Sequence, residues 1–144
     1  MKPNFMIAMY CLAIILTRPK IYQSVVIGLL VGVVSQIPML NATPLVNIAS
    51  EMVGALVCGI LVTVLAKVVR DNKTCQNVVF PIITTFISTV FSGYTFAMIV
   101  GVVVAHLDPL AVFGVYAVMV LGTATMNAVL AAILTPVLRA VLKR

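Results

Sequence analysis

Residues 110–138 read LAVFGVYAVMVLGTATMNAVLAAILTPVL, and this stretch decides the fold. It contains no Asp, Glu, Lys or Arg, and it is longer than the about 20 apolar residues that a helix needs to cross a bilayer. An apolar run of this length predicts a transmembrane helix. Because the run exceeds the usual length, we expect the helix to be tilted or to extend past the membrane.

Four further apolar segments precede this one, at residues 5–17, 22–37, 46–69 and 77–105. Short polar or proline-containing linkers separate them, at residues 18–20, 38–44, 70–73 and 106–109. Proline and polar residues at such edges are typical of helix starts and stops. The pattern predicts an all-α, polytopic membrane helix bundle with five spans, of which the first is short.

The composition agrees with a membrane protein. Hydrophobic residues make up 63% of the chain and charged residues 8%, whereas about a quarter of a soluble domain is charged. So few charges cannot cover the surface of a soluble fold. With 144 residues in all, the helices leave no room for a soluble module, and we expect one transmembrane domain over residues 1–144.

The basic residues lie on one side of the predicted bundle. If five spans alternate, eight of the nine cations share one side: Arg18, Lys20, Lys67, Arg70, Lys73, Arg139, Lys143 and Arg144. Cytoplasmic loops carry such an excess, so the C-terminus is predicted in the cytoplasm, in the inner or plasma membrane. The net charge of +6 does not indicate nucleic-acid binding, because the cations sit at helix ends and form no basic face.

The sequence does not favour an enzyme. It has one His, three widely spaced acids and three cysteines (Cys11, Cys58 and Cys75) without a CxxC or Cys/His cluster. We therefore expect no catalytic residues, no metal, no cofactor and no disulfide. A Gly-x-x-x-x-Gly-Lys-[Ser/Thr] phosphate loop is also absent from the sequence, so any ATP hydrolysis would have to come from partner proteins.

Four collinear stretches resemble the S components of energy-coupling factor (ECF) importers, and among these the tryptophan-transport type, the TrpP family. They are Lys2–Met9 (KPNFMIAM), Asn47–Glu51 (NIASE), Thr89–Phe96 (TVFSGYTF) and Ala124–Asn127 (ATMN). They are similar to the family's Lys-Pro-Asp, Asn-Ile-x-Asp-Lys, Thr-x-x-Ser-Gly-x-x-Phe and Thr-Ala-x-Asn stretches. No single motif is specific, and their joint order carries the resemblance.

The resemblance implies a six-helix S-component fold in which residues 5–17 form the second helix, so a first helix is expected before Met1. It implies a substrate-binding subunit that imports tryptophan or a related small aromatic compound, held near the outer surface. The implied partners are a transmembrane T subunit and ATPase subunits. Asn4 and the pair Ser50–Glu51 depart from the family's acid and its Asp-Lys pair, which leaves the exact substrate open.

Glu51 is the first candidate substrate-binding residue, because it is the only acid inside an apolar segment. An intramembrane carboxylate is costly and usually faces a cavity or a partner. It would pair with the ammonium group or the indole N–H of a ligand, or else reach the outer interface or pair with Lys2. Asn47, at the predicted start of the same helix, would either cap that helix or bind the ligand.

Four more residues are candidates for substrate contacts. Asn127 is an amide in the middle of a span, where it would bind the ligand or join two helices. Tyr94 could form part of an aromatic wall, although aromatics at helical spacing are usually core. Asn4 and Gln36 fall near the outer loops that the resemblance associates with substrate.

A ridge of small residues marks a candidate docking face. Ser24, Gly28, Gly32 and Gln36 follow one another at four-residue steps on one side of the second segment. Small residues let helix backbones approach closely in lipid. The ridge predicts helix packing within the chain or, at Gly28 and Gly32, docking of a partner helix.

Two other classes of function remain open at this stage. The chain could be an ion- or proton-coupled carrier of small solutes, or a helical membrane scaffold without transport. A proton relay would need several ionisable groups inside the membrane, and Glu51 is the only acid within an apolar segment. Dependence of uptake on co-expressed ATPase and T subunits would distinguish an importer subunit from either alternative.

Overall fold

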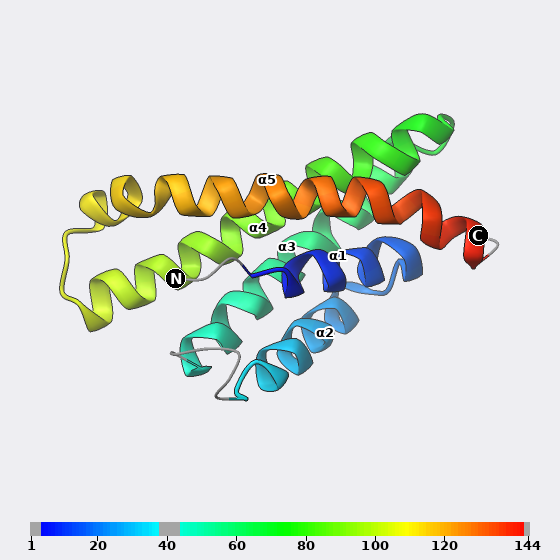
Figure 1. The fold of residues 1–144 in the computed structure, drawn as a ribbon. Coiled ribbons are helices and arrows are strands. Elements are labelled where there is room, and N and C mark those ends of the chain that lie inside the picture. The colour runs from blue at the N-terminus through cyan, green and yellow to red at the C-terminus, as the bar shows by residue number, and fades with distance from the viewer. Residues whose placement is uncertain (1–3, 38–43, 143–144) are drawn as a thin grey trace.

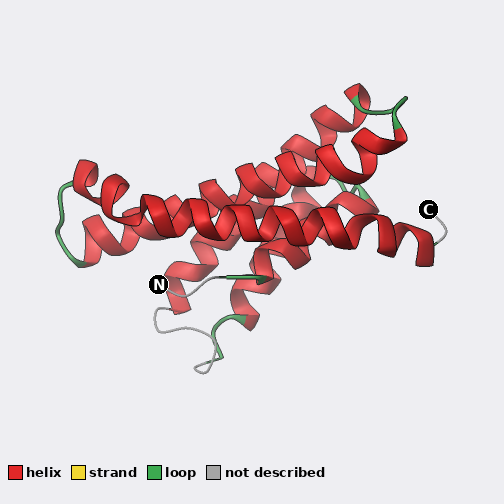
Figure 2. Cartoon of the chain, turned by 45° about the horizontal axis from the view of Figure 1, so that its top comes forward, coloured by secondary structure: helices red, strands yellow, loops and turns green. Residues whose placement is uncertain are grey.

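A computed structural model describes residues 4–37 and 44–142. Within these ranges all regular secondary structure is helical, and five α-helices joined by short loops follow the five predicted apolar segments (Figures 1 and 2). They are α1 (Met6–Thr17), α2 (Ile21–Val34), α3 (Pro44–Val68), α4 (Phe80–Met98) and α5 (Pro109–Val141). The predicted all-α fold class is therefore confirmed.

Wider π-helical turns extend α4 at both ends, as η1 (Cys75–Val79) and η2 (Ile99–Val104). Among the described residues, three continuous helices are long and apolar enough to cross a bilayer: Leu45–Val68, Cys75–Val104 and Pro109–Val141. Helices α1 and α2 have 12 and 14 residues. At 1.5 Å per residue they measure about 18 and 21 Å, which is less than the about 30 Å of a bilayer core.

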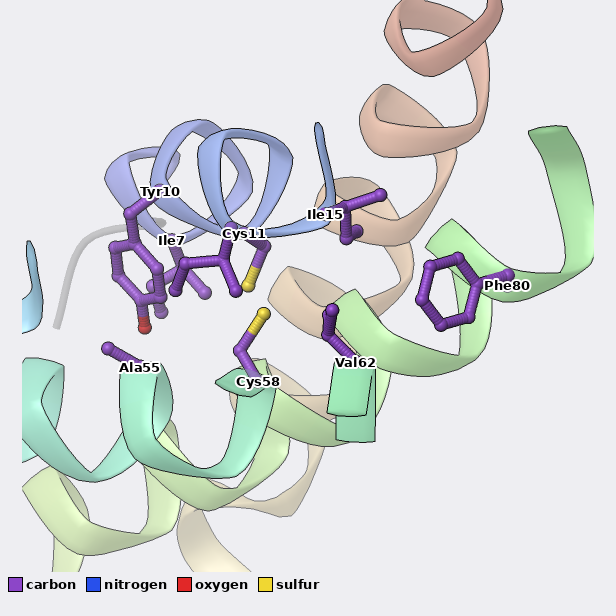
Figure 3. Close-up of a cluster of buried hydrophobic side chains, with 9 residues drawn as sticks. Ile7, Tyr10, Cys11, Ile15, Ala55, Cys58, Val62 and Phe80 are labelled. Carbon is purple, nitrogen blue, oxygen red and sulfur yellow. The ribbon is translucent and has the colours of Figure 1, made fainter. Parts of the chain in front are cut away.

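Helix α1 contacts all four other helices. Seven of its twelve residues are buried, whereas Met9, Ala13 and Thr17, which share one face at four-residue steps, are exposed. Figure 3 shows the resulting core, in which Tyr10, Cys11 and Ile15 of α1 face Ala55 and Cys58 of α3. The short helix is therefore held by packing.

Helices α2 and α3 pack closely because two glycines face α3. A Cβ atom on Gly28 would lie 2.6 Å from the Ala55 Cβ and 2.7 Å from the Glu51 carbonyl oxygen. A Cβ on Gly32 would lie 2.8 Å from the Ile48 Cα. Only hydrogen fits at these positions, as in other close helix crossings in membranes.

The chain runs so that three segment ends meet at one end of the bundle. The turn after α1, the turn between α3 and α4, and the end of α5 all lie toward the right of Figure 1. Arg18, Lys73 and Arg139 from these three places line one common cleft. The structure thus gathers these predicted same-side cations in space.

Candidate functional site

Glu51 lies in the interior of the bundle. It sits about two turns into α3, which begins at Pro44, and it is fully buried. One carboxylate oxygen, Oε1, accepts a hydrogen bond from the side-chain amide of Asn4. A buried carboxyl group in an apolar helix is expensive, so its surroundings point to a specific role.

Asn4 joins Glu51 to the rest of the site. It lies just before α1, and its Oδ1 accepts from the Met6 backbone N–H at 3.1 Å, which holds the side chain in place. Its backbone carbonyl accepts from Asn127 Nδ2 on α5 at 3.0 Å. Asn4 thereby contacts α3 through its side-chain amide and α5 through its backbone carbonyl.

Asn127 and Thr89 complete the connection. Asn127 is fully buried near the middle of α5, and its Nδ2 also donates to Thr89 Oγ1 on α4 at 3.4 Å. The Thr89 hydroxyl donates in turn to the Thr85 carbonyl, at 2.8 Å. We call Asn4, Glu51, Thr89 and Asn127 the polar cluster, and it ties α3, α4, α5 and the residues before α1 together.

The polar cluster leaves two acceptors unused. Among the described residues, Glu51 Oε2 and Asn127 Oδ1 have no hydrogen-bond partner although both are buried. The Tyr10 hydroxyl is buried nearby, close to the Glu51 carboxyl group but without a hydrogen bond of standard geometry. Buried polar groups are normally paired, so unpaired acceptors inside a bundle are able to accept from N–H or O–H donors.

Asn47 stands on the same face as Glu51, one turn earlier on α3, and only 6% of its surface is exposed. Because α3 begins at Pro44, Asn47 lies inside the first turn and does not cap the helix, which corrects the capping alternative. Its carbonyl accepts from the Ser50 hydroxyl at 3.1 Å. Asn47 thus extends the buried polar face of α3 toward the helix start.

Comparison with known proteins identifies the family. Residues 1–143 match the family described as tryptophan transporter TrpP, which is essentially the whole chain. The chain belongs to the TrpP family. Neither the curated proteins nor the solved structures include a significant match. The resemblance to a TrpP-type S component is confirmed, and this TrpP-family chain is a multi-pass membrane protein of a transporter family.

Two other predicted site residues of this TrpP-family chain make contacts with residues outside the polar cluster. Tyr94 is half-buried on α4 and packs its ring against Phe113 of α5, with centroids 4.7 Å apart. Gln36, just past α2, donates its side-chain amide to the Gly32 carbonyl at 3.1 Å.

The Gly28 and Gly32 face of this TrpP-family chain is in contact with α3 of the same chain. A partner helix could use that face only by displacing α3. The packing therefore favours the intramolecular alternative for the ridge, and it does not support the two glycines as a partner-docking site.

Sequence reasoning did not select Tyr10 or Thr89 as site residues of the TrpP-family chain. The Tyr10 hydroxyl lies where a Cβ on Gly54 would approach it to 2.3 Å, next to Ser92 of α4. Tyr10 lies in a helix that is otherwise largely apolar, so its hydroxyl was the only feature that could have marked it as a site residue. Thr89 was part of a quoted family stretch, but its partner on α5 is far away in sequence.

Proposed function

We propose that this chain is the substrate-binding membrane subunit of an ECF importer for tryptophan or a closely related aromatic compound. Membership of the tryptophan transporter TrpP family supports the substrate class. The observation that carries the proposal is the buried polar cluster, in which Glu51 Oε2 and Asn127 Oδ1 are acceptors without partners among the described residues. They can receive the N–H groups of an amino acid.

The chemistry of tryptophan fits this arrangement. Its ammonium group would donate to Glu51 Oε2 and to Asn127 Oδ1, because the pairing of a cation with a buried carboxylate lowers the cost of both charges. Its carboxylate would sit toward the start of α3, where first-turn N–H groups and the Asn47 amide are donors. The indole ring would lie among the apolar side chains of the bundle.

Asn4 has a defined part in this proposal. It already holds Glu51 Oε1 and accepts from Asn127, so it fixes the distance between the two ligand-binding side chains. It is also half-exposed, whereas the other three members of the polar cluster are buried. We propose that substrate enters past Asn4, and that this residue moves when the site fills.

The chain's own residues do not supply energy for import. Its sequence has no phosphate loop, so ATP hydrolysis belongs to ATPase subunits that act through a T subunit. The excess of Lys and Arg at one end would place that end, and the C-terminus, in the cytoplasm. Substrate would then approach from the outer side, toward which the start of α3 points.

An uptake assay tests this assignment. Cells deficient in their own tryptophan uptake would express the chain with or without a T subunit and its ATPase subunits. We expect labelled tryptophan to accumulate only with the complete set, and to stop accumulating when the ATPase lysine of the phosphate loop is replaced. Undiminished uptake by the chain alone would contradict the proposal and favour an ion-coupled carrier.

A further inference from the structure

A second site lies at the opposite end of α1 from the polar cluster. A cleft of about 660 Å³ opens between the last turn of α1, the start of η1 and the last turns of α5. Polar side chains from three separate segments line it, namely Arg18, Lys73, Gln76, Asn77 and Arg139. Neither the polar cluster nor the proposed transport chemistry uses these residues.

The cleft is strongly basic. It gathers Arg18, Lys73 and Arg139, and none of the described residues that line it is acidic. Arg139 Nη1 donates to Asn77 Oδ1 at 2.8 Å, which fixes one guanidinium at the wall of the cleft. Three cations that share one cleft repel one another, and an anion between them would relieve that repulsion.

The backbone at Arg18 adds an independent observation. Arg18 ends α1 in the left-handed conformation, with φ at 47°, while its N–H bonds the Ile14 carbonyl at 2.9 Å. Glycine is the usual residue at such a helix end, because a side chain there is strained by about 1 kcal/mol. An arginine at this position accepts strain and brings a guanidinium to the cleft.

The floor of the cleft is apolar. Ile15 and Leu16 of α1 and Pro136 of α5 line the cleft together with the cations, and of these Leu16 and Pro136 are half-exposed while Ile15 is fully buried. We propose that the cleft binds the phosphodiester headgroup of an anionic phospholipid, with the cations on the phosphate and the lipid chains along the apolar floor. Basic pockets between helices at this depth are suited to anionic headgroups, whereas a free phosphate would gain nothing from an apolar floor.

Lipid retention measured on the full chain tests the proposal. The chain in detergent would be offered phosphatidylglycerol or phosphatidylcholine with identical acyl chains, and the bound lipid would be counted by native mass spectrometry. We expect a preference for phosphatidylglycerol. Each cation near a membrane surface is worth about fivefold in binding, so Arg18→Gly combined with Arg139→Gln is expected to reduce that preference roughly 25-fold.

The matched control is Lys67→Gln, which removes an exposed charge at the same end of the bundle but outside the cleft. It is expected to retain the preference. Arg18→Gly alone keeps the test usable if the double variant is unstable, because glycine relieves the backbone strain. This single variant is expected to unfold at the same or a higher temperature and still to lose about fivefold in lipid preference.

Three results would overturn the proposal. The first is equal retention of the two lipids by the unaltered chain. The second is a loss in Lys67→Gln as large as that in the cleft variants, which would show a general surface-charge effect. The third is binding of glycerol phosphate as tight as that of phosphatidylglycerol, which would identify a site for free anions.

Discussion

Glu51→Gln is expected to weaken tryptophan binding by about 100-fold, because truncating one partner of a buried, hydrogen-bonded charge pair costs about 2–5 kcal/mol. Glutamine keeps the shape of the side chain and an oxygen that can accept from Asn4, so the fold should remain intact. The change removes the negative charge that the proposal assigns to the substrate's ammonium group. Equilibrium binding of labelled tryptophan to the purified chain measures the effect.

Asp108→Asn is the matched control for this experiment. Asp108 caps α5 by accepting from the Leu110 N–H at 2.9 Å, and asparagine caps helices equally well. The α4–α5 loop that contains Asp108 lies at the far end of the hairpin from α1 (Figure 1). The control should bind tryptophan normally. Glu51→Gln with unchanged affinity would contradict the role of Glu51.

Gly28→Ala is expected to destabilise the chain by about 1–3 kcal/mol, the usual cost of overpacking a filled interior. The new methyl group would lie 2.6 Å from the Ala55 Cβ and 2.7 Å from the Glu51 carbonyl oxygen. Neither atom can move without shifting α3, so α2 must move outward. Because the clash falls on Glu51 itself, tryptophan binding should weaken as well. Thermal unfolding in a mild detergent measures the stability.

Gly114→Ala provides the comparison, since a Cβ at Gly114 would meet no atom within 4 Å. Alanine is the better helix former by about 1 kcal/mol, so this variant should be as stable as the original chain or more so. Comparison of Gly28→Ala with Gly114→Ala also tests whether the small-residue ridge packs within the chain or docks a partner helix. If Gly28→Ala left the isolated chain fully stable and impaired only assembly with a partner, the α2–α3 packing described above would be contradicted.

The fold class and the helix positions could be predicted from the sequence because they depend on local composition. Apolar runs with few or no charges, bounded by Pro, Asn or basic residues, predicted all five segments. The ends differ by a few residues, since α2 stops at Val34 and α5 continues to Val141. Glu51 also stood out locally, as the only acid in an apolar segment.

The contacts between distant segments could not be predicted in this way. Asn4 and Asn127 were each selected as candidates, but the sequence contains no sign that the carbonyl of one accepts from the amide of the other. Tyr10 was missed because a hydroxyl in an apolar helix has no periodicity to mark it. Asn47 was misplaced as a possible cap because Pro44, a common first residue of helices, starts α3 earlier.

The most direct test of the central claim is a titration of the purified chain with free tryptophan. The chain contains no tryptophan, so the ligand is the only indole in the sample and its emission under selective excitation reports its surroundings. We predict a saturable blue shift that Glu51→Gln removes and Asp108→Asn retains. A flat titration of the folded chain would contradict a tryptophan site in the polar cluster.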